Sequence, residues 1–153
     1  MRSSLDEVVG AASVATQWLA ANVHWLAKRH FQRIRRYAID VHTPLAHHAY
    51  MIFIETRVFT RQVAELLDDD EYAEFQMRLQ GAPLSGDVIE GTGGLRKIRV
   101  AAKGRGKRGG ARVIYFHVSS DQQIRLLLIY AKGVKDDLNA QEKSILRKLN
   151  EEW

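Results

Sequence analysis

The segment Gly91–Tyr115, GTGGLRKIRVAAKGRGKRGGARVIY, contains the strongest pattern in the chain. Two runs of strand-forming residues, Leu95–Ala102 and Ala111–Val118, flank a loop that is rich in glycine and basic residues. No acidic residue interrupts the basic residues of this segment, which are Arg96, Lys97, Arg99, Lys103, Arg105, Lys107, Arg108 and Arg112. The pattern predicts a β-hairpin that binds a polyanion, and it favours RNA.

The chain downstream of this hairpin predicts one more strand and a final helix. Ile124–Ala131 is strand-like, and the SSDQQ segment before it indicates an antiparallel turn. Asn139, with Glu142 three positions later, is typical of a helix N-cap. The apolar stripe of this helix consists of Leu138, Ile145, Leu146, Leu149 and Trp153.

The chain upstream of the hairpin predicts a short strand and two helices. Ile52–Glu55 is β-branched and strand-like. A first helix is indicated by the helical spacing of Val58, Val63, Leu66 and Leu67. Asp68–Asp70 supply the N-cap and first turn of a second helix. Its apolar stripe is Tyr72, Phe75, Met77 and Leu79, and the residues that end it are Gly81, Pro83 and Gly86.

These elements follow one another in the order β-α-α-β-β-β-α. Strands joined by short turns favour antiparallel pairing. The helices must bury their apolar stripes, and a sheet face provides the surface for this. The sequence therefore predicts an α+β fold in which helices pack against a small, mostly antiparallel sheet.

Composition bounds the classes of function that the chain can have. Its 153 residues are enough for one domain with a short appendage. The formal net charge is +5, which favours nucleic acid or another anionic partner. The chain has no cysteine, so disulfides and thiolate zinc sites are excluded.

Residues 1–50 differ in pattern from the rest. Val8–Ala27 carries no formal charge, but polar residues dilute it too strongly for a membrane span, so an amphipathic or poorly packed helix is predicted. The segment around Pro44 has no clear periodicity and is typical of a linker. Its histidines, His42, His47 and His48, lack acidic or thiol partners at fitting spacing, so no metal site is predicted there.

Two segments together resemble a known family. GDVIEGTGGLRKIRVAAKGRGKRGGARVIY (residues 86–115) and LLLIYAKGVKDDLNAQEK (residues 126–143) are similar to toxins of the RelE/HigB superfamily of type II toxin–antitoxin systems, with the HigB-like branch as the nearest match. The resemblance covers Met51–Trp153. Met51 lies where such a toxin would begin, so we interpret residues 1–50 as an N-terminal extension that could reflect a misassigned start codon.

The resemblance implies a RelE-like fold and a cytoplasmic endoribonuclease that cleaves mRNA on translating ribosomes without a cofactor. It also implies a cognate antitoxin as partner, of the HigA-like kind with a helix-turn-helix domain. Lys97 and Arg99 match two basic active-site positions of the family, and Arg112 matches the arginine that contacts the scissile phosphate.

Metal-free RNA cleavage has three chemical requirements: removal of the 2′-OH proton, stabilisation of the charged phosphorane, and departure of the 5′-oxygen. Because side chains alternate along a strand, Lys97 and Arg99 share one face, whereas Ile98 and Val100 face the core. Neighbouring cations favour a neutral amine, so Lys97 is either a general base or a phosphate clamp. Tyr130 and Lys132 share a face at the end of the last strand. Tyr130 is a candidate for base stacking or positioning, and Lys132 is a candidate for leaving-group or phosphate contact. The remaining RNA-binding candidates are Arg96, Lys103, Arg105, Lys107, Arg108 and Lys135.

Two other functions remain open at this stage. A ParE-like toxin that poisons DNA gyrase would belong to the same superfamily, although that branch tends to lack the basic catalytic set that this chain retains. A non-catalytic RNA-binding module would need only the charge. Without the resemblance, the simplest interpretation of Lys97 and Arg99 is a solvated strand face.

Overall fold

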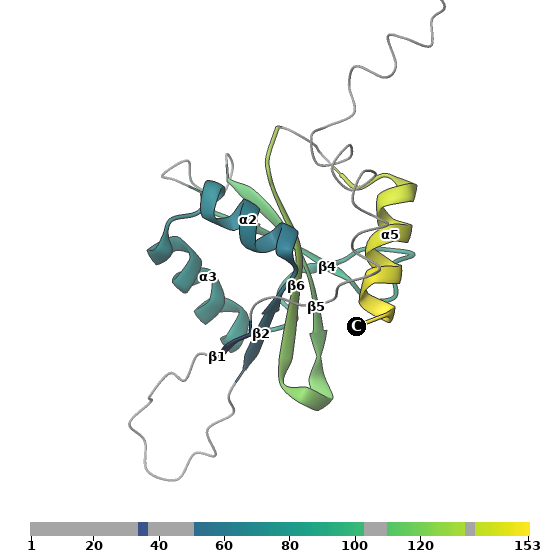
Figure 1. Ribbon diagram of the computed structural model, residues 1–153, viewed down its shortest axis with the longest axis horizontal. Coiled ribbons are helices and arrows are strands. Elements are labelled where there is room, and N and C mark those ends of the chain that lie inside the picture. The colour runs from purple at the N-terminus through teal and green to yellow at the C-terminus, as the bar shows by residue number, and fades with distance from the viewer. Residues whose placement is uncertain (1–33, 37–50, 103–109, 134–136) are drawn as a thin grey trace, which may run out of the picture.

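The computed structural model describes residues 51–102, 110–133 and 137–153, together with the backbone of Ile34–Arg36. The described residues form a mixed sheet with helices on both faces, which confirms the α+β prediction (Figure 1). No helix within these ranges is long and apolar enough to cross a membrane. The predicted helix at Val8–Ala27 and the predicted linker around Pro44 lie outside the described residues.

The sheet has six strands in the order β1-β2-β6-β5-β4-β3. The pair β2–β6 is parallel and all the others are antiparallel. The strands are β1 (Ile34–Arg36), β2 (Ile52–Glu55), β3 (Asp87–Val88), β4 (Arg96–Val100), β5 (Ala111–Val118) and β6 (Gln123–Ala131). The sheet is therefore mostly antiparallel, as predicted.

Each of the three α-helices in the described ranges begins at a side-chain cap, and two of these caps, Asp68 and Asn139, were predicted from the sequence. Thr56 caps α2 (Arg57–Leu66) by accepting the N–H of Phe59 at 3.1 Å. Capping boxes begin α3 (Asp69–Gly81) and α5 (Ala140–Glu151). In each box the N-cap side chain accepts the backbone N–H of a glutamate three residues later, and the carboxylate of that glutamate accepts the backbone N–H of the N-cap residue. These signals span only three residues, so local sequence suffices to define them.

The helices divide the core into two apolar clusters, one on each face of the sheet (Figure 1). α2 and α3 cover one face, where Phe59, Phe75 and Leu79 pack against Val113 and Tyr115. The other face is covered by α5, whose Leu146 belongs to the cluster of Ile114 and Leu128. Alternate residues of β5 thus enter opposite clusters, as strand geometry requires.

The structure differs from the sequence prediction in several details. The strand predicted at Leu95–Ala102 is shorter, and the two-residue β3 was not predicted. Met77 was predicted in the apolar stripe of α3, but it is 52% exposed, and Gln76 is buried instead. Positions 72, 75, 76 and 79 follow the i, i+3, i+4, i+7 stripe, whereas position 77 points away from it.

The upstream segment also differs from the prediction. A helical or poorly ordered extension was expected, but Ile34–Arg36 forms β1 and pairs with Ile52–Ile54 along the outer edge of β2. An added edge strand satisfies backbone groups that β2 would otherwise leave open. These three residues therefore extend the sheet of the domain that follows them.

Candidate functional site

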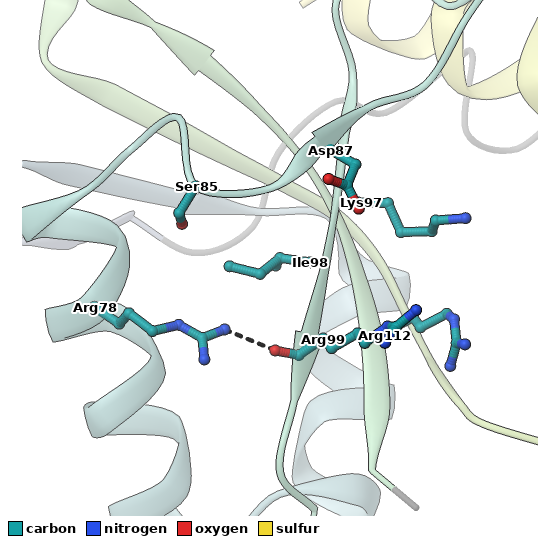
Figure 2. Close-up of a pocket in the computed structure, with 7 residues that line it drawn as sticks. All are labelled: Arg78, Ser85, Asp87, Lys97, Ile98, Arg99 and Arg112. Carbon is teal, nitrogen blue, oxygen red and sulfur yellow. Dashed lines mark hydrogen bonds between the residues drawn. The ribbon is translucent and has the colours of Figure 1, made fainter. Parts of the chain in front are cut away.

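A cavity of about 530 Å³ opens where the free edge of β4 meets the loop after α3. The residues that line it are Arg78, Ser85, Asp87, Lys97, Ile98, Arg99 and Arg112 (Figure 2). Three of the cations predicted from the sequence, Lys97, Arg99 and Arg112, are among them. The cavity is therefore the candidate functional site.

Strand register brings these three cations together. Arg99 and Arg112 are Cα partners in the β4–β5 ladder, and Lys97 lies two residues before Arg99 on β4. Figure 2 shows the side chains of Lys97, Arg99 and Arg112 on one side of the two strands, and that of Ile98 on the other. The prediction that Lys97 and Arg99 share a face is confirmed. The register adds what the sequence left open, namely that Arg112 joins them.

The direct opposition of Arg99 and Arg112 is electrostatically unfavourable. Like charges at directly opposed strand positions destabilise a sheet. Within the described ranges, neither guanidinium group has an acidic partner. An anion bound between them would relieve the repulsion, and arginine's planar fork can donate to two phosphate oxygens at once. The pair is therefore suited to a phosphate group.

Lys97 has an acidic partner that sequence reasoning missed. Its Nζ lies 3.0 Å from Oδ1 of Asp137, which follows β6 and precedes the N-cap of α5. The hydrogen bond from Lys97 is the main reason that the pKa of Asp137 lies below its usual value, and the N–H of Leu138 and the charge of Lys143 act in the same direction. Asp137 is thus a carboxylate at neutral pH.

Asp87 is a second acidic residue at the site. It is the Cα partner of Lys97 in the β3–β4 ladder and lines the cavity. Arg78 and Ser85 also line the cavity and were not predicted from the sequence. The two-residue strand that carries Asp87 has no periodicity to detect, and Arg78 has the pattern of an ordinary residue on a helix surface. There was therefore no sequence signal for Asp87 or Arg78.

Tyr130 is a Cα partner of Arg112 but belongs to the core cluster on the α5 side. Only 3% of its surface is exposed, and its hydroxyl has no hydrogen-bond partner in the described structure. Burial raises the pKa of Tyr130 to about 12; the positive charge of Arg112 opposes this rise and the negative charge of Asp137 adds to it. The ring is thus placed under the site, where it is not available for stacking with a base.

Two further residues predicted at the site, Arg96 and Lys132, are not among the described residues that line the cavity. Arg96 faces away from Lys97, and its guanidinium donates to the carbonyls of Leu84 at 3.0 Å and Gly86 at 2.8 Å. Lys132 is exposed in the turn after β6 and does not line the cavity. Lys103, Arg105, Lys107, Arg108 and Lys135 lie outside the described residues.

Arg96 and Tyr115 instead hold the wall that carries Ser85 and Asp87. The Tyr115 hydroxyl accepts the N–H of Gly86 at 3.0 Å and donates to the carbonyl of Pro83 at 2.9 Å. Burial raises the pKa of Tyr115. A Cβ on Gly86 would lie 2.8 Å from the Tyr115 ring, so only glycine allows this close approach.

The site offers charge and hydrogen-bond donors on strands, and nothing in the described ranges suggests a metal centre: no group of three or more histidines, aspartates or glutamates there could hold a metal ion. The predicted linker histidines fall outside those ranges. What the cavity can do chemically is hold a phosphate through cations and accept a proton at a carboxylate.

Comparison with protein-family models gives one match. The family described as the RelE toxin of the RelE/RelB toxin–antitoxin system matches residues 51–153, which is more than half of the chain. The matched range includes every residue that lines the cavity.

Proposed function

The chain belongs to the RelE family of toxin–antitoxin toxins, and we propose that it is a ribosome-dependent mRNA endonuclease of the HigB-like branch. The observation that carries the proposal is the cavity in which Arg99 and Arg112 are directly opposed and Lys97 lies on the same side. A basic set of this kind favours RNA cleavage over gyrase poisoning, because the ParE-like branch of the superfamily tends to lack these basic residues.

The proposed reaction is an internal phosphoryl transfer. The 2′-oxygen attacks phosphorus, the bond from phosphorus to the 5′-oxygen breaks, and a 2′,3′-cyclic phosphate forms. The 2′-OH loses its proton to a base on the protein, and the departing 5′-oxygen takes up a proton. The transition state gains negative charge on the phosphate oxygens, which Arg99 and Arg112 are placed to stabilise.

The ion pair of Lys97 favours one of its two predicted roles. An ammonium group that donates to Asp137 at 3.0 Å has no free lone pair with which to accept a proton. We therefore assign Lys97 as a phosphate clamp. Asp87 supplies the carboxylate among the lining residues in the described structure, and we assign it as the acceptor of the 2′-OH proton. Lys132 stays a predicted contact to the leaving group or to a phosphate, and it does not line the cavity.

The biological setting follows from the family. RelE-family toxins have a cognate antitoxin, and we propose a HigA-like antitoxin with a helix-turn-helix domain. Ribosomes and mRNA as targets place the activity in the cytoplasm. We also propose that residues 51–153 are the toxin domain and that residues 1–50 extend it, with Ile34–Arg36 contributing an edge strand.

The test is cleavage of mRNA in a translation extract. Full-length protein should cut translated mRNA and leave a 2′,3′-cyclic phosphate end. Arg112→Ala should lower the cleavage rate at least about a hundredfold, because one preorganised donor to the transition state is worth that much. Arg147→Gln is the matched control, since it removes an exposed arginine of α5 that does not line the cavity.

Two results would overturn the proposal. One is cleavage by Arg112→Ala at the wild-type rate. The other is intact translated mRNA together with trapped gyrase–DNA complexes, which would identify a ParE-like toxin. RNA binding without cleavage by the wild-type protein would instead indicate a binding module.

A further inference from the structure

We propose that Arg78 of α3 is a further RNA-binding residue, which holds a phosphate next to the scissile one as the strand passes the free edge of β4. The inference rests on the proposed function and extends it to a residue that neither the sequence pattern nor the family match singles out. Arg78 lines the same cavity as Arg99 and Arg112, but it comes from a helix on the opposite face of the sheet.

The edge of β4 is open where Arg78 reaches it. β3 pairs with Arg96 and Lys97, and no strand of the described ranges lies beside Ile98–Val100 on that side. One guanidinium nitrogen of Arg78 donates to the carbonyl oxygen of Arg99 at 2.7 Å (Figure 2). This hydrogen bond fixes the guanidinium group at the rim of the cavity.

The guanidinium group still has capacity to bind a phosphate. Arginine has five N–H donors, and the bond to Arg99 uses one of them. The described contacts of Arg78 include no carboxylate, so its positive charge is not neutralised by an ion pair. Glu71 and Glu74 line, together with Arg78 and Val100, a smaller hollow of about 40 Å³. Their negative charge would repel RNA, which limits the path of the strand to the side of Arg99.

The charge of the cavity exceeds what one phosphate needs. Among the described residues, its lining contains four cationic side chains, Arg78, Lys97, Arg99 and Arg112, and one acidic side chain, Asp87. Asp137 adds a second negative charge through its ion pair with Lys97, so these six groups carry a net charge of +2. A phosphodiester carries a single negative charge, and Arg99, Arg112 and Lys97 are grouped on one side of β4. Figure 2 shows Arg78 across β4 from this group. The surplus cation is therefore placed for a neighbouring phosphate of single-stranded RNA.

The salt dependence of RNA binding tests this role. The probe is a short single-stranded oligoribonucleotide with 2′-O-methyl groups, which lacks the nucleophile, and its affinity for the full chain is measured by fluorescence anisotropy over a KCl series. Each phosphate contact to single-stranded nucleic acid contributes about 0.7 to the log–log slope. Arg78→Gln should reduce the slope by about 0.7 and weaken binding about tenfold at low salt.

Two further variants separate charge at this position from other effects. Arg78→Lys keeps the charge but loses the fork, so it should retain the wild-type slope and lose only part of the affinity. Arg147→Gln changes the net charge equally, yet it should leave the slope unchanged because it lies outside the cavity. If Arg78→Gln does not fold, Arg78→Ala is measured in the same way, with the same expected loss of about 0.7 in the slope.

An unchanged slope for Arg78→Gln would overturn the inference, whatever happens to its thermal stability, because Arg78 would then only support β4. The proposed function fails on a different result, the retention of cleavage by Arg112→Ala. The two outcomes are independent, so either idea can fall without the other.

Discussion

The ammonium group of Lys97 and the carboxylate of Asp137 lie 3.0 Å apart and connect β4 to the segment that opens α5. The same carboxylate oxygen accepts the N–H of Leu138 at 2.9 Å, so the ion pair is continuous with the start of the helix. Asp137 is 60% exposed and Lys97 is 25% exposed, which makes the pair accessible to solvent and to RNA. The carboxylate of Asp137 is therefore already bound to the ammonium group that we assign as a phosphate clamp.

Removal of this charge should strengthen RNA binding. Asp137→Asn keeps an oxygen for the Leu138 N–H but releases Lys97 from its ionic partner. We expect affinity for the 2′-O-methyl oligoribonucleotide to rise by up to about fivefold, because an exposed pair of this kind is worth up to about 1 kcal/mol. Glu65→Gln makes the same charge change on the exposed side of α2 and is the control. Weaker binding by Asp137→Asn would contradict competition between Asp137 and the phosphate.

The same pair predicts the direction of an acid effect on stability. The pKa of Asp137 is lower in the folded protein than its ordinary value of 3.8, chiefly through the hydrogen bond from Lys97. Its contribution to stability is therefore present above pH 3.8 and is lost as the pH falls through the folded-state value. Urea unfolding between pH 7 and pH 3 should show a smaller loss of stability for Asp137→Asn than for the wild type. An equal loss in the two proteins would exclude a stabilising role for the pair.

Tyr130→Phe should not destabilise the protein. The hydroxyl is buried and has no partner in the described structure, so its removal relieves a desolvation cost and should leave the free energy of unfolding unchanged or about 1 kcal/mol higher. RNA cleavage should also be retained, because the group is buried and stays protonated. A large loss of cleavage with normal stability would instead show that the hydroxyl acts in the reaction.

The stability of the wild type and that of Tyr130→Phe should also differ in their response to alkaline pH. The folded state keeps the Tyr130 proton up to a pKa of about 12, whereas the unfolded chain loses it near 10.0. Stability of the wild type should therefore fall as the pH rises from 10 to 12, and Tyr130→Phe should lack this component. Chemical denaturation at a series of pH values measures the difference.

Tyr115→Phe removes the hydroxyl of a tyrosine that, unlike Tyr130, makes hydrogen bonds through this group. The N–H of Gly86 and the carbonyl of Pro83 would lose their partner, which should cost about 1–3 kcal/mol in the free energy of unfolding. Because these contacts hold the loop with Ser85 and Asp87, cleavage should fall as well. Tyr130→Phe is the matched control, and equal stability of the two variants would contradict this account of the loop.

Glu55→Gln tests a buried network away from the cavity. Glu55 is 2% exposed and accepts hydrogen bonds from the hydroxyls of Thr60 at 2.6 Å and Tyr72 at 2.7 Å. An amide would put a donor where a hydroxyl donates, so the free energy of unfolding should fall by about 1–3 kcal/mol. RNA affinity at a temperature where the variant is folded should not change. A matching loss of affinity would mean that the network supports the site.

Local sequence was enough for the helices and for the faces of the strands. The capping residues of α3 and α5 lie within three positions of their partners, and strand alternation alone places Lys97 and Arg99 together. The hairpin of β5 and β6 was also predicted from its short turn. Periodicity was less reliable where a stripe is narrow, as the exposure of Met77 shows.

The charges of the hairpin follow from the sequence by itself, but their grouping into a site was decided by tertiary structure. The seventeen positions from Arg96 to Arg112 include eight basic residues. The β4–β5 register places Arg99 opposite Arg112. Loop packing turns the Arg96 guanidinium toward the carbonyls of Leu84 and Gly86. Arg78 reaches the cavity, and Asp137 pairs with Lys97, from other segments of the chain. The physical reason is range: alternation and capping act between near neighbours, whereas the distance between charges on separate elements depends on how the sheet and helices pack.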